Sequence, residues 1–351
     1  MTVEGELFVR LAWTGARVEG VRIRSTRRDA ASRVLKGRLP ADALAWIPRV
    51  FSICARAQEA AARHALANAG ADIAPAPDTD AVRREIVDEG FFRLLIDWPR
   101  AVGVEPEATT VARARGADDA ALAALVHHRI FGEAPSAWLE RHTYENLVAW
   151  TATAATLPAR LLGMLLRETP SLGRSDVALM PPPTRAAIES KMLAAMSTDP
   201  EYGRAPTWDG APVETGAIVR MRAHPLVAAV IAHDGVTAGA RMTARLAELA
   251  HLVASTTLPH ADGFAVSAGE GVGAVETARG FLLHHARIAG GRVADYRILA
   301  PTEWNFHPQG ALARGLAGIT GRDGADVERL ARIAVHALDP CVACSIEVAH
   351  A

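Results

Sequence analysis

The sequence has few cysteines, few aromatic residues and no surplus of charge of either sign. Its 351 residues include three cysteines, 5% aromatic residues, and 38 basic against 39 acidic side chains, for a formal net charge of −1 at pH 7. An odd, sparse set of cysteines argues against a disulfide framework and for a reducing compartment, so we expect a cytoplasmic protein. Because no basic surplus exists, we expect no nucleic-acid partner.

A long hydrophobic run is also missing. The most apolar stretch, residues 146–166, is interrupted by Pro158 and Arg160. This interruption favours a pair of buried helices over a membrane span, so we expect no membrane partner. The first residues carry two acids, Glu4 and Glu6, where a secretory signal needs a basic region before an apolar run, and we expect no export signal.

The hydrophobic pattern predicts both strands and helices. Residues 6–13 and 17–25 alternate apolar and polar side chains around a short turn, which is typical of a β-hairpin with one solvated face. Helical spacing predominates afterwards. We predict helices over residues 48–68, 81–96, 117–131, 142–167, 237–256 and 323–337, and a turn followed by a strand over 290–299. The sequence therefore predicts one α+β domain over residues 1–351, with an N-terminal β-hairpin and a predominantly helical body.

Cys341 and Cys344 form a C-x-x-C pair near the end of the sequence. This spacing suits metal ligation, dithiol redox chemistry or packing alone. Structural zinc would need four ligands, and Cys54 has no second cysteine beside it because position 51 is Phe. Three converging thiolates would suit iron or nickel as well as zinc, and a buried, apolar Cys54 is the alternative. We expect Cys54 to lie near a helix N-terminus, where the dipole would favour its thiolate.

Other motifs for known chemistry are weak or missing. The run GEGVG at 269–273 suggests a dinucleotide-binding loop, but Ala274 replaces the third glycine and the run before it is a weak strand. The histidine pairs 127–128 and 284–285 lie in no H-E-x-x-H helix, so we expect surface or hydrogen-bonded histidines. The sequence has no G-x-S-x-G elbow and no P-loop, which disfavours triad hydrolysis and Walker-type ATP use.

Seven short segments, read in order, match one pattern. They are VEG at 3–5, VLKGR at 34–38, RVFSIC at 49–54, PVETGAIVR at 212–220, ETARG at 276–280, YRILAPTEWN at 296–305 and DPCVAC at 339–344. Together these segments resemble the large subunit of nickel–iron hydrogenases. The resemblance implies that fold, and it implies roles for the three thiols: Cys54 and Cys344 match cysteines that bridge nickel and iron, and Cys341 matches a terminal nickel ligand.

The resemblance also implies roles for four polar residues. Arg279 and Thr302 match the residues that hydrogen-bond the cyanide ligands of the iron, a suitable task for a guanidinium and a hydroxyl. Asp339 matches the aspartate that precedes the last cysteine pair, and Glu4 matches a glutamate that relays protons. Without the resemblance, these residues would be read as a surface ion pair, turn or cap residues and a solvated acid.

Departures from the enzyme pattern are selective. Phe51 replaces the remaining terminal nickel ligand, Gln58 replaces a histidine, and Glu347 stands where the enzymes' mature C-terminal histidine would lie, so we expect no removable maturation peptide. The iron-facing groups remain while a nickel ligand is gone. In this the chain resembles the HupK (HoxV-like) family of hydrogenase maturation accessory proteins, which are shorter relatives of the large subunit.

This second resemblance implies a non-catalytic scaffold. It would receive the Fe(CN)2CO fragment from the HypC–HypD complex, hold it transiently and pass it to the immature hydrogenase large subunit, with a HypC-type chaperone as a further partner and no nickel. Two alternatives stay open. One is a divergent hydrogenase that activates hydrogen with three cysteines, against which Phe51 and Gln58 argue. The other is a metal-free interaction protein that recruits the maturation chaperones.

Overall fold

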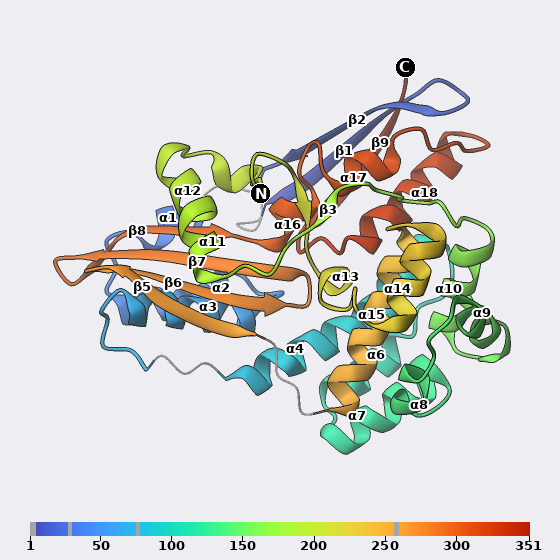
Figure 1. Ribbon diagram of the computed structural model, residues 1–351, viewed down its shortest axis with the longest axis horizontal. Coiled ribbons are helices and arrows are strands. Elements are labelled where there is room, and N and C mark those ends of the chain that lie inside the picture. The colour runs from blue at the N-terminus through green and yellow to red at the C-terminus, as the bar shows by residue number, and fades with distance from the viewer. Residues whose placement is uncertain (1–4, 27–29, 75–77, 256–259) are drawn as a thin grey trace.

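The computed structural model describes residues 5–26, 30–74, 78–255 and 260–351. The chain starts with the predicted antiparallel hairpin of β1 (Glu6–Trp13) and β2 (Val18–Ser25). Alternate side chains of β1 are buried, as the pattern predicted. A strand that we did not predict, β9 (Ala343–His350), pairs with β1 in parallel and completes a sheet in the order β2-β1-β9. Segments near the two ends of the chain therefore lie side by side (Figure 1).

Three helices follow the hairpin: α1 (Ala30–Leu35), α2 (Pro40–Val50) and α3 (Ala55–Asn68). The continuous helix predicted over 48–68 is therefore wrong at its start. Pro48 lies in the last turn of α2, where it has no amide hydrogen to donate, and the backbone of Phe51 leaves the helical region with φ −118° and ψ 71°. Helical structure resumes only after Cys54, which places this cysteine directly at the N-terminus of α3.

A second, antiparallel sheet contains β5 (Ala261–Ser267), β6 (Glu270–Thr277), β7 (Gly280–Ala289) and β8 (Arg292–Leu299) in that order. Only β8 was predicted. Helix α3 packs closely on β6, because a Cβ at Gly273 would lie 2.0 Å from the carbonyl oxygen of Ala61 and one at Gly271 would lie 2.4 Å from that of Ala65. The run GEGVG at 269–273 thus forms a hairpin turn and a strand that admits a helix at short range.

The helical body lies beside this sheet (Figure 1). Its helices confirm the predictions over 81–96, 117–131 and 142–167, the last of which is a pair that divides at Thr156. They are α4 (Thr79–Phe92), η1 (Arg93–Asp97), α5 (Trp98–Ala101), α6 (Ala108–Arg115), α7 (Asp119–Leu125), η2 (Val126–Phe131), α8 (Pro135–Leu139), α9 (Tyr144–Thr153), α10 (Leu157–Arg167), α14 (Pro225–Asp234) and α15 (Ala238–Ala254). No helix in the described ranges is both long enough and apolar enough to cross a membrane.

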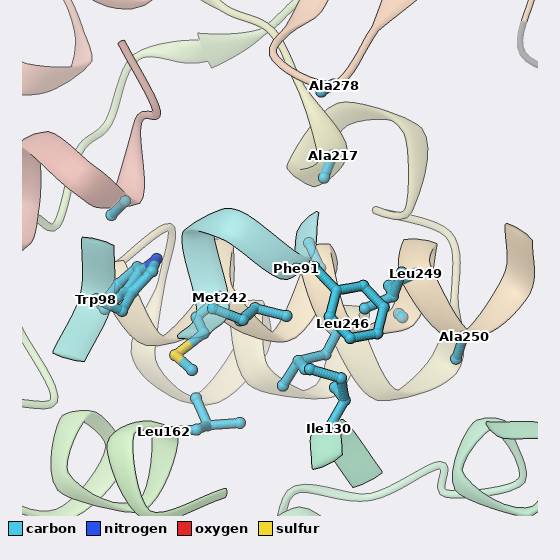
Figure 2. Close-up of a cluster of buried hydrophobic side chains, with 14 of the residues drawn as sticks. Phe91, Trp98, Ile130, Leu162, Ala217, Met242, Leu246, Leu249, Ala250 and Ala278 are labelled. Atoms are coloured by element: carbon cyan, nitrogen blue, oxygen red, sulfur yellow. The ribbon is translucent and has the colours of Figure 1, made fainter. Parts of the chain in front are cut away.

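Helix α15 runs through the centre of this body. Figure 2 shows Met242, Leu246 and Leu249 among side chains from the surrounding helices, including Phe91 and Leu162. The sequence predicted one buried stripe, but nearly every residue of α15 is buried, polar ones included. A helix that is buried on all sides needs partners for its charged side chains, and these partners lie in the site described below.

The remaining described elements are mostly short. They are β3 (Ala178–Leu179), α11 (Arg185–Ala187), η3 (Ile188–Leu193), α12 (Ala194–Thr198), η4 (Tyr202–Arg204), β4 (Val213–Glu214), α13 (Ala217–Arg220), α16 (Pro301–Asn305), α17 (Ala311–Leu316) and α18 (Gly324–Ala337). Of these, β3 and β4 form a third, two-stranded sheet. Helix α18 confirms the prediction over 323–337. The α+β class with an N-terminal hairpin is confirmed, and the longer strands that the sequence pattern missed are β5, β6, β7 and β9.

Candidate functional site

Cys54 precedes the first turn of α3 and is 8% exposed. The side chain of Cys54 does not cap α3. Instead, the carboxylate of Glu85 on α4 accepts hydrogen bonds from the amides of Arg56 (2.8 Å) and Ala57 (3.1 Å). A carboxylate at this end of a helix satisfies free amides and complements the helix dipole. Glu85 thereby fixes the backbone that carries Cys54.

Arg279 reaches this thiol from the turn between β6 and β7. Its Nη1 donates a hydrogen bond to Sγ of Cys54 at 3.0 Å, its Nη2 donates to Oε2 of Glu89 at 2.6 Å, and the side chain is almost completely buried. The turn can approach the 213–216 segment because Gly280 has φ 126° and a Cβ there would lie 2.6 Å from the amide nitrogen of Gly216. The backbone thus delivers Arg279 into the interior.

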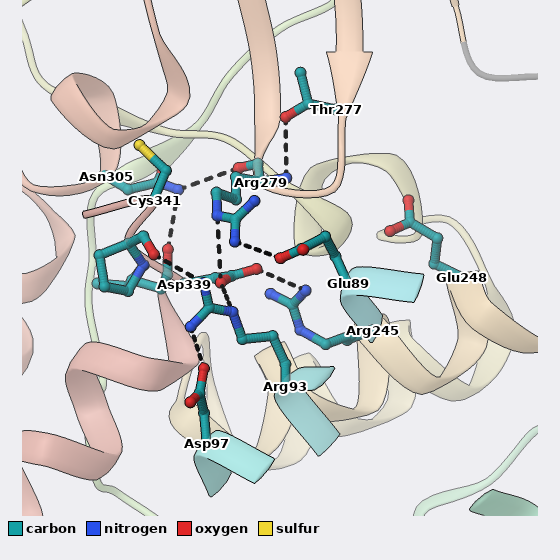
Figure 3. A network of polar contacts seen from close by, with 12 residues as sticks. Glu89, Arg93, Asp97, Arg245, Glu248, Thr277, Arg279, Asn305, Asp339 and Cys341 are labelled. Atoms are coloured by element: carbon teal, nitrogen blue, oxygen red, sulfur yellow. Dashed lines mark hydrogen bonds and ion pairs between the residues drawn. The ribbon is translucent and has the colours of Figure 1, made fainter. Parts of the chain in front are cut away.

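Asp339 lies at the centre of an ionic cluster (Figure 3). Its carboxylate pairs with Nε of Arg93, with Nη1 of Arg245 at 2.9 Å, and with Nε of Arg279 at 3.5 Å. Burial alone would raise the pKa of Asp339, but the charges of Arg93, Arg279 and Arg245 hold it at about 2. The backbone of Asp339 is left-handed, with φ 54°, a conformation that aspartate tolerates better than most residues.

Thr302, in the first turn of α16, contacts Cys341, the second of the three predicted thiols. Its Oγ1 lies 2.9 Å from Sγ of Cys341 and accepts the amide hydrogen of Cys341 at 3.4 Å. At the end of α16, Asn305 accepts the amide of Thr215 at 2.9 Å and donates to the carbonyl oxygen of Arg279 at 3.5 Å. Four of the segments that carried the resemblance, 212–220, 276–280, 296–305 and 339–344, therefore meet here.

Burial shifts the pKa values of Cys54 and Cys344. It raises the pKa of Cys54 to about 12, opposed by Arg279 and reinforced by the charges of Cys341, Glu85 and Glu89. The prediction that Cys54 lies near a helix N-terminus is confirmed, but burial opposes the thiolate that the dipole would favour. Burial also raises the pKa of Cys344 to about 11, and Arg332 opposes this shift.

Cys344 lies on β9, opposite Leu7 of β1. Cys341 and Cys344 both line a cavity of about 310 Å³, whereas Cys54 is not among the described residues that line it. The other polar lining residues are Arg93, Asp97, Arg332 and His336. Within the described ranges, no group of three or more His, Cys, Asp or Glu side chains is arranged as a set of metal ligands. The ligand roles of the three cysteines stay predictions, and Glu4 lies outside the described residues.

Two of the three departures from the enzyme pattern, Phe51 and Gln58, lie in the core, whereas Glu347 is exposed on β9. Phe51 is 8% exposed and packs in a cluster with Ile47 and Tyr296. Gln58 is buried, and its Oε1 lies 2.8 Å from Nε2 of His284, whose Nδ1 lies 2.7 Å from the hydroxyl of Tyr296. Burial lowers the pKa of His284 to about 3, so this histidine is neutral. The prediction of a hydrogen-bonded histidine at 284 is confirmed.

Several residues of the site carried no sequence signal. Glu85 and Glu89 are spaced by one helical turn on α4, which is typical of the charged, solvent-exposed side of a helix, and Arg245 lies on α15 without a motif around it. The signal that could have found Arg245 is its place, with Arg241 and Glu248, in a helix that is otherwise mostly apolar or small, because a buried arginine requires a carboxylate partner.

Known proteins resemble this chain along most of its length. A family profile described as nickel-dependent hydrogenase matches residues 213–347. The hydrogenase expression/formation protein HoxV of Cupriavidus necator is 30% identical over 386 residues, covering 99% of this chain and 98% of HoxV. The hydrogenase expression/formation protein HupK of Azotobacter vinelandii is 34% identical over 331 residues, covering 91% of each chain.

Solved hydrogenase structures share the fold. The nickel–iron–selenium hydrogenase from D. vulgaris Hildenborough superposes with a TM-score of 0.60 at 15% identity, covering 94% of each chain. A NAD+-reducing nickel–iron hydrogenase gives a TM-score of 0.54 at 16% identity, covering 93% of this chain and 92% of that chain. The fold predicted from the resemblance, that of a hydrogenase large subunit, is confirmed.

Proposed function

This chain belongs to the family of hydrogenase expression/formation proteins that includes HoxV and HupK, and we propose that it is a non-catalytic accessory scaffold in hydrogenase maturation. In this proposal it holds the Fe(CN)2CO fragment transiently in the cytoplasm. The HypC–HypD complex supplies the fragment, the immature hydrogenase large subunit receives it, and a HypC-type chaperone is a further partner. The names of the relatives support the role in maturation, and the proposed cargo rests on the site.

The contact between Arg279 and Cys54 is the observation that carries this proposal. Nη1 of Arg279, which can donate a hydrogen bond to a cyanide nitrogen, lies 3.0 Å from Sγ of Cys54, a candidate iron ligand. The hydroxyl of Thr302 lies at a similar distance, 2.9 Å, from Sγ of Cys341. Arg279 presents five N–H donors, of which Nε is buried and lacks a hydrogen bond, although Asp339 is its ion-pair partner. The donor set therefore fits an iron fragment that carries both thiolate and cyanide ligands.

The residues have separate tasks in this scheme. Cys54, Cys341 and Cys344 would ligate the iron, and Arg279 and Thr302 would hold its cyanides. Asp339 would orient Arg279, because these two side chains form an ion pair. Glu4 would relay protons, as the resemblance implies.

Binding of the fragment would be coupled to proton release. A thiol must lose its proton to ligate iron, and the pKa of Cys54 is about 12 before the fragment binds. The proton lost from Cys54 is therefore part of the binding equilibrium. A scaffold that must release its cargo gains from this coupling, because reprotonation of the thiol favours release.

The test is infrared spectroscopy with iron and nickel quantification on the full chain, purified without oxygen from cells that contain the maturation machinery. We expect cyanide and carbonyl stretching bands with iron and without nickel. Cys54→Ala, Cys341→Ala and Cys344→Ala should each lose the bands, whereas Ser345→Ala, an exposed neighbour of Cys344, should keep them.

Two outcomes would replace the proposal. Hydrogen uptake by the purified chain with bound nickel would identify a divergent hydrogenase. The unmodified chain could instead contain no iron and show no bands. If it still bound the large subunit or its chaperone after removal of all three cysteines, it would be identified as a metal-free recruiter of the maturation machinery.

A further inference from the structure

The outer face of α2 exposes large apolar side chains that the core does not use. Leu39, immediately before the helix, is 48% exposed, and Trp46 is 37% exposed. On the opposite side of α2, Ala43 and Ile47 are completely buried. Positions 39, 42, 46 and 49 follow helical spacing and share the outer side, so Leu39 and Trp46 belong to one surface.

Cations surround this apolar pair. The guanidinium carbon of Arg38 lies 4.6 Å from the centre of the Trp46 ring, and that of Arg49 lies 6.0 Å from it. Lys36 lies in the connection between α1 and α2. Arg292, the first residue of β8, donates a hydrogen bond to the carbonyl oxygen of Gly37 at 2.9 Å. In the described part of the chain, none of Lys36, Arg38, Arg49 and Arg292 forms an ion pair with a carboxylate. The surface also carries one acid, the exposed Asp42, so its formal charge is positive.

The backbone beneath these cations is held in place. The amide of Gly37 donates to the carbonyl of Val293 at 2.8 Å, and the amide of Val293 donates to the carbonyl of Arg38 at 3.0 Å. Nε of Arg38 also donates to the carbonyl of Val34 at 2.6 Å. The α1–α2 connection is thus tied to the edge strand β8. A surface that is ordered before binding loses little conformational entropy when a partner docks.

We propose that this surface is a docking site for an acidic segment of a partner protein that also carries an apolar side chain. We call it the α2 face and define it by Lys36, Arg38, Leu39, Asp42, Trp46, Arg49 and Arg292. Tryptophan and arginine are the side chains most enriched at the energetic centres of protein interfaces. The cations, which form no ion pair within the described residues, would attract an acidic segment, and the exposed part of the Trp46 side chain would contact the apolar side chain of that segment.

A protein partner fits this surface better than a membrane or a nucleic acid. Helix α2 has only 11 residues and its other apolar side is packed in the core, so it cannot lie in a lipid interface as an amphipathic helix does. Nucleic-acid binding needs an extended basic stripe, whereas the chain has a formal net charge of −1 and the α2 face has only four cations.

The inference rests on the proposed function only for the choice of probes, which are the purified large-subunit precursor and the purified HypC-type chaperone. Helix α2 ends at Val50 and Cys54 lies four residues later, so a partner docked here would bind beside the segment that leads to Cys54. Binding through the α2 face needs no iron, and iron loading needs no α2 face. The two proposals can therefore fail separately.

The experiment measures affinity of the full chain for each probe by biolayer interferometry at low and physiological salt. Arg38→Glu/Arg49→Glu and Trp46→Ala should each weaken binding of at least one probe by about tenfold or more. The matched control is Arg22→Glu/Arg24→Glu, which reverses two exposed arginines on β2 and should change affinity less than about twofold. Unchanged circular dichroism and thermal unfolding would show that each variant is folded.

Photo-crosslinking gives a second, independent readout. A benzoylphenylalanine introduced at Trp46 should form an adduct with the same probe, mapped by mass spectrometry to an acidic segment, and one at the equally exposed Val104 should not. Equal affinity of the α2 and β2 charge reversals for both probes, or equal adduct yields at positions 46 and 104, would overturn the proposal. So would binding to phosphatidylglycerol vesicles or to oligo-dT that Trp46→Ala abolishes, with no binding to either protein.

Discussion

Arg279 and Cys54 are separated by 225 positions in the sequence, and the guanidinium of one donates a 3.0 Å hydrogen bond to the sulfur of the other. This contact links the turn between β6 and β7 to the N-terminus of α3. The same guanidinium also pairs with Glu89 and Asp339, so its position is fixed from three sides. If a mutation removes one of these partners, the other two still hold the guanidinium. The effect of each contact of Arg279 can therefore be measured by a separate mutation.

Arg279→Gln should reduce iron occupancy of the anaerobically purified protein by about tenfold or more, because a charge-assisted donor beside Cys54 is lost. Arg245→Gln is the matched control: it also removes a buried arginine that pairs with Asp339, but Arg245 makes no contact with Cys54 among the described residues. Iron content per chain and the infrared cyanide bands are the measurements. Equal losses in the two variants would mean that Arg279 acts only through the ionic cluster.

Asp339→Asn should destabilise the fold by about 3–5 kcal/mol, because three buried arginines lose the carboxylate that compensates them. Asp42→Asn, a change at an exposed acid, should alter the free energy of unfolding by less than about 0.5 kcal/mol. Urea unfolding followed by circular dichroism measures both. A small effect of Asp339→Asn would show that water or other side chains can replace this carboxylate.

The difference in stability between the unmodified chain and Asp339→Asn should depend on pH. The pKa of Asp339 is about 2 in the folded chain, below the ordinary value of about 3.8. The stabilisation from Asp339 is therefore complete above about pH 4 and is lost as the pH falls toward 2. The stability difference between the unmodified chain and Asp339→Asn should shrink over that window. A difference that stays constant would contradict the low pKa.

His284 should make the fold weaken at mildly acidic pH. Its pKa is about 3 in the folded chain, because burial disfavours the charged ring, against about 6.5 when exposed. The unfolded chain therefore binds more protons below pH 6.5, and stability falls by up to about 1.4 kcal/mol per pH unit on this account. Urea unfolding between pH 7 and 5 should show a shallower dependence for His284→Gln than for His350→Gln, which changes an exposed histidine.

Gly273→Ala should destabilise the protein by about 3 kcal/mol or more, because its new Cβ would lie 2.0 Å from the carbonyl oxygen of Ala61 and would separate α3 from β6. Gly116→Ala is the control, since a Cβ at Gly116 meets nothing within 4 Å. Thermal unfolding measures both. Similar midpoints for the two variants would mean that the helix can shift away from the sheet without loss.

The sequence predicted elements with strong periodicity and missed a strand built largely from small residues, β6. The β1–β2 hairpin and α18 have clear patterns, whereas β6 contains glycines at alternate positions and resembles a loop until α3 is seen packed on it. Pro48 was read as a helix start because proline favours the first turn, but the residues before it already form α2.

The sequence predicted several residues of the candidate site but not the contacts between them. Order and resemblance selected Cys54, Arg279, Thr302 and Cys341, while their distances depend on how α3, β7 and α16 pack. Glu89 and the other members of the ionic cluster have no motif around them. Their role follows from burial, which forces each charge to find a partner, and burial depends on the whole fold.

The pairing of β1 with β9 imposes an order on folding during synthesis. Residue 6 leaves the ribosome long before residue 343, so one edge of β1 has no strand to pair with until the last cysteine has been translated. An open strand edge invites association with other chains, which makes this interval the one in which the nascent protein most needs protection. Cys344 takes its place opposite Leu7 only when that edge closes, so one of the three candidate iron ligands is positioned last.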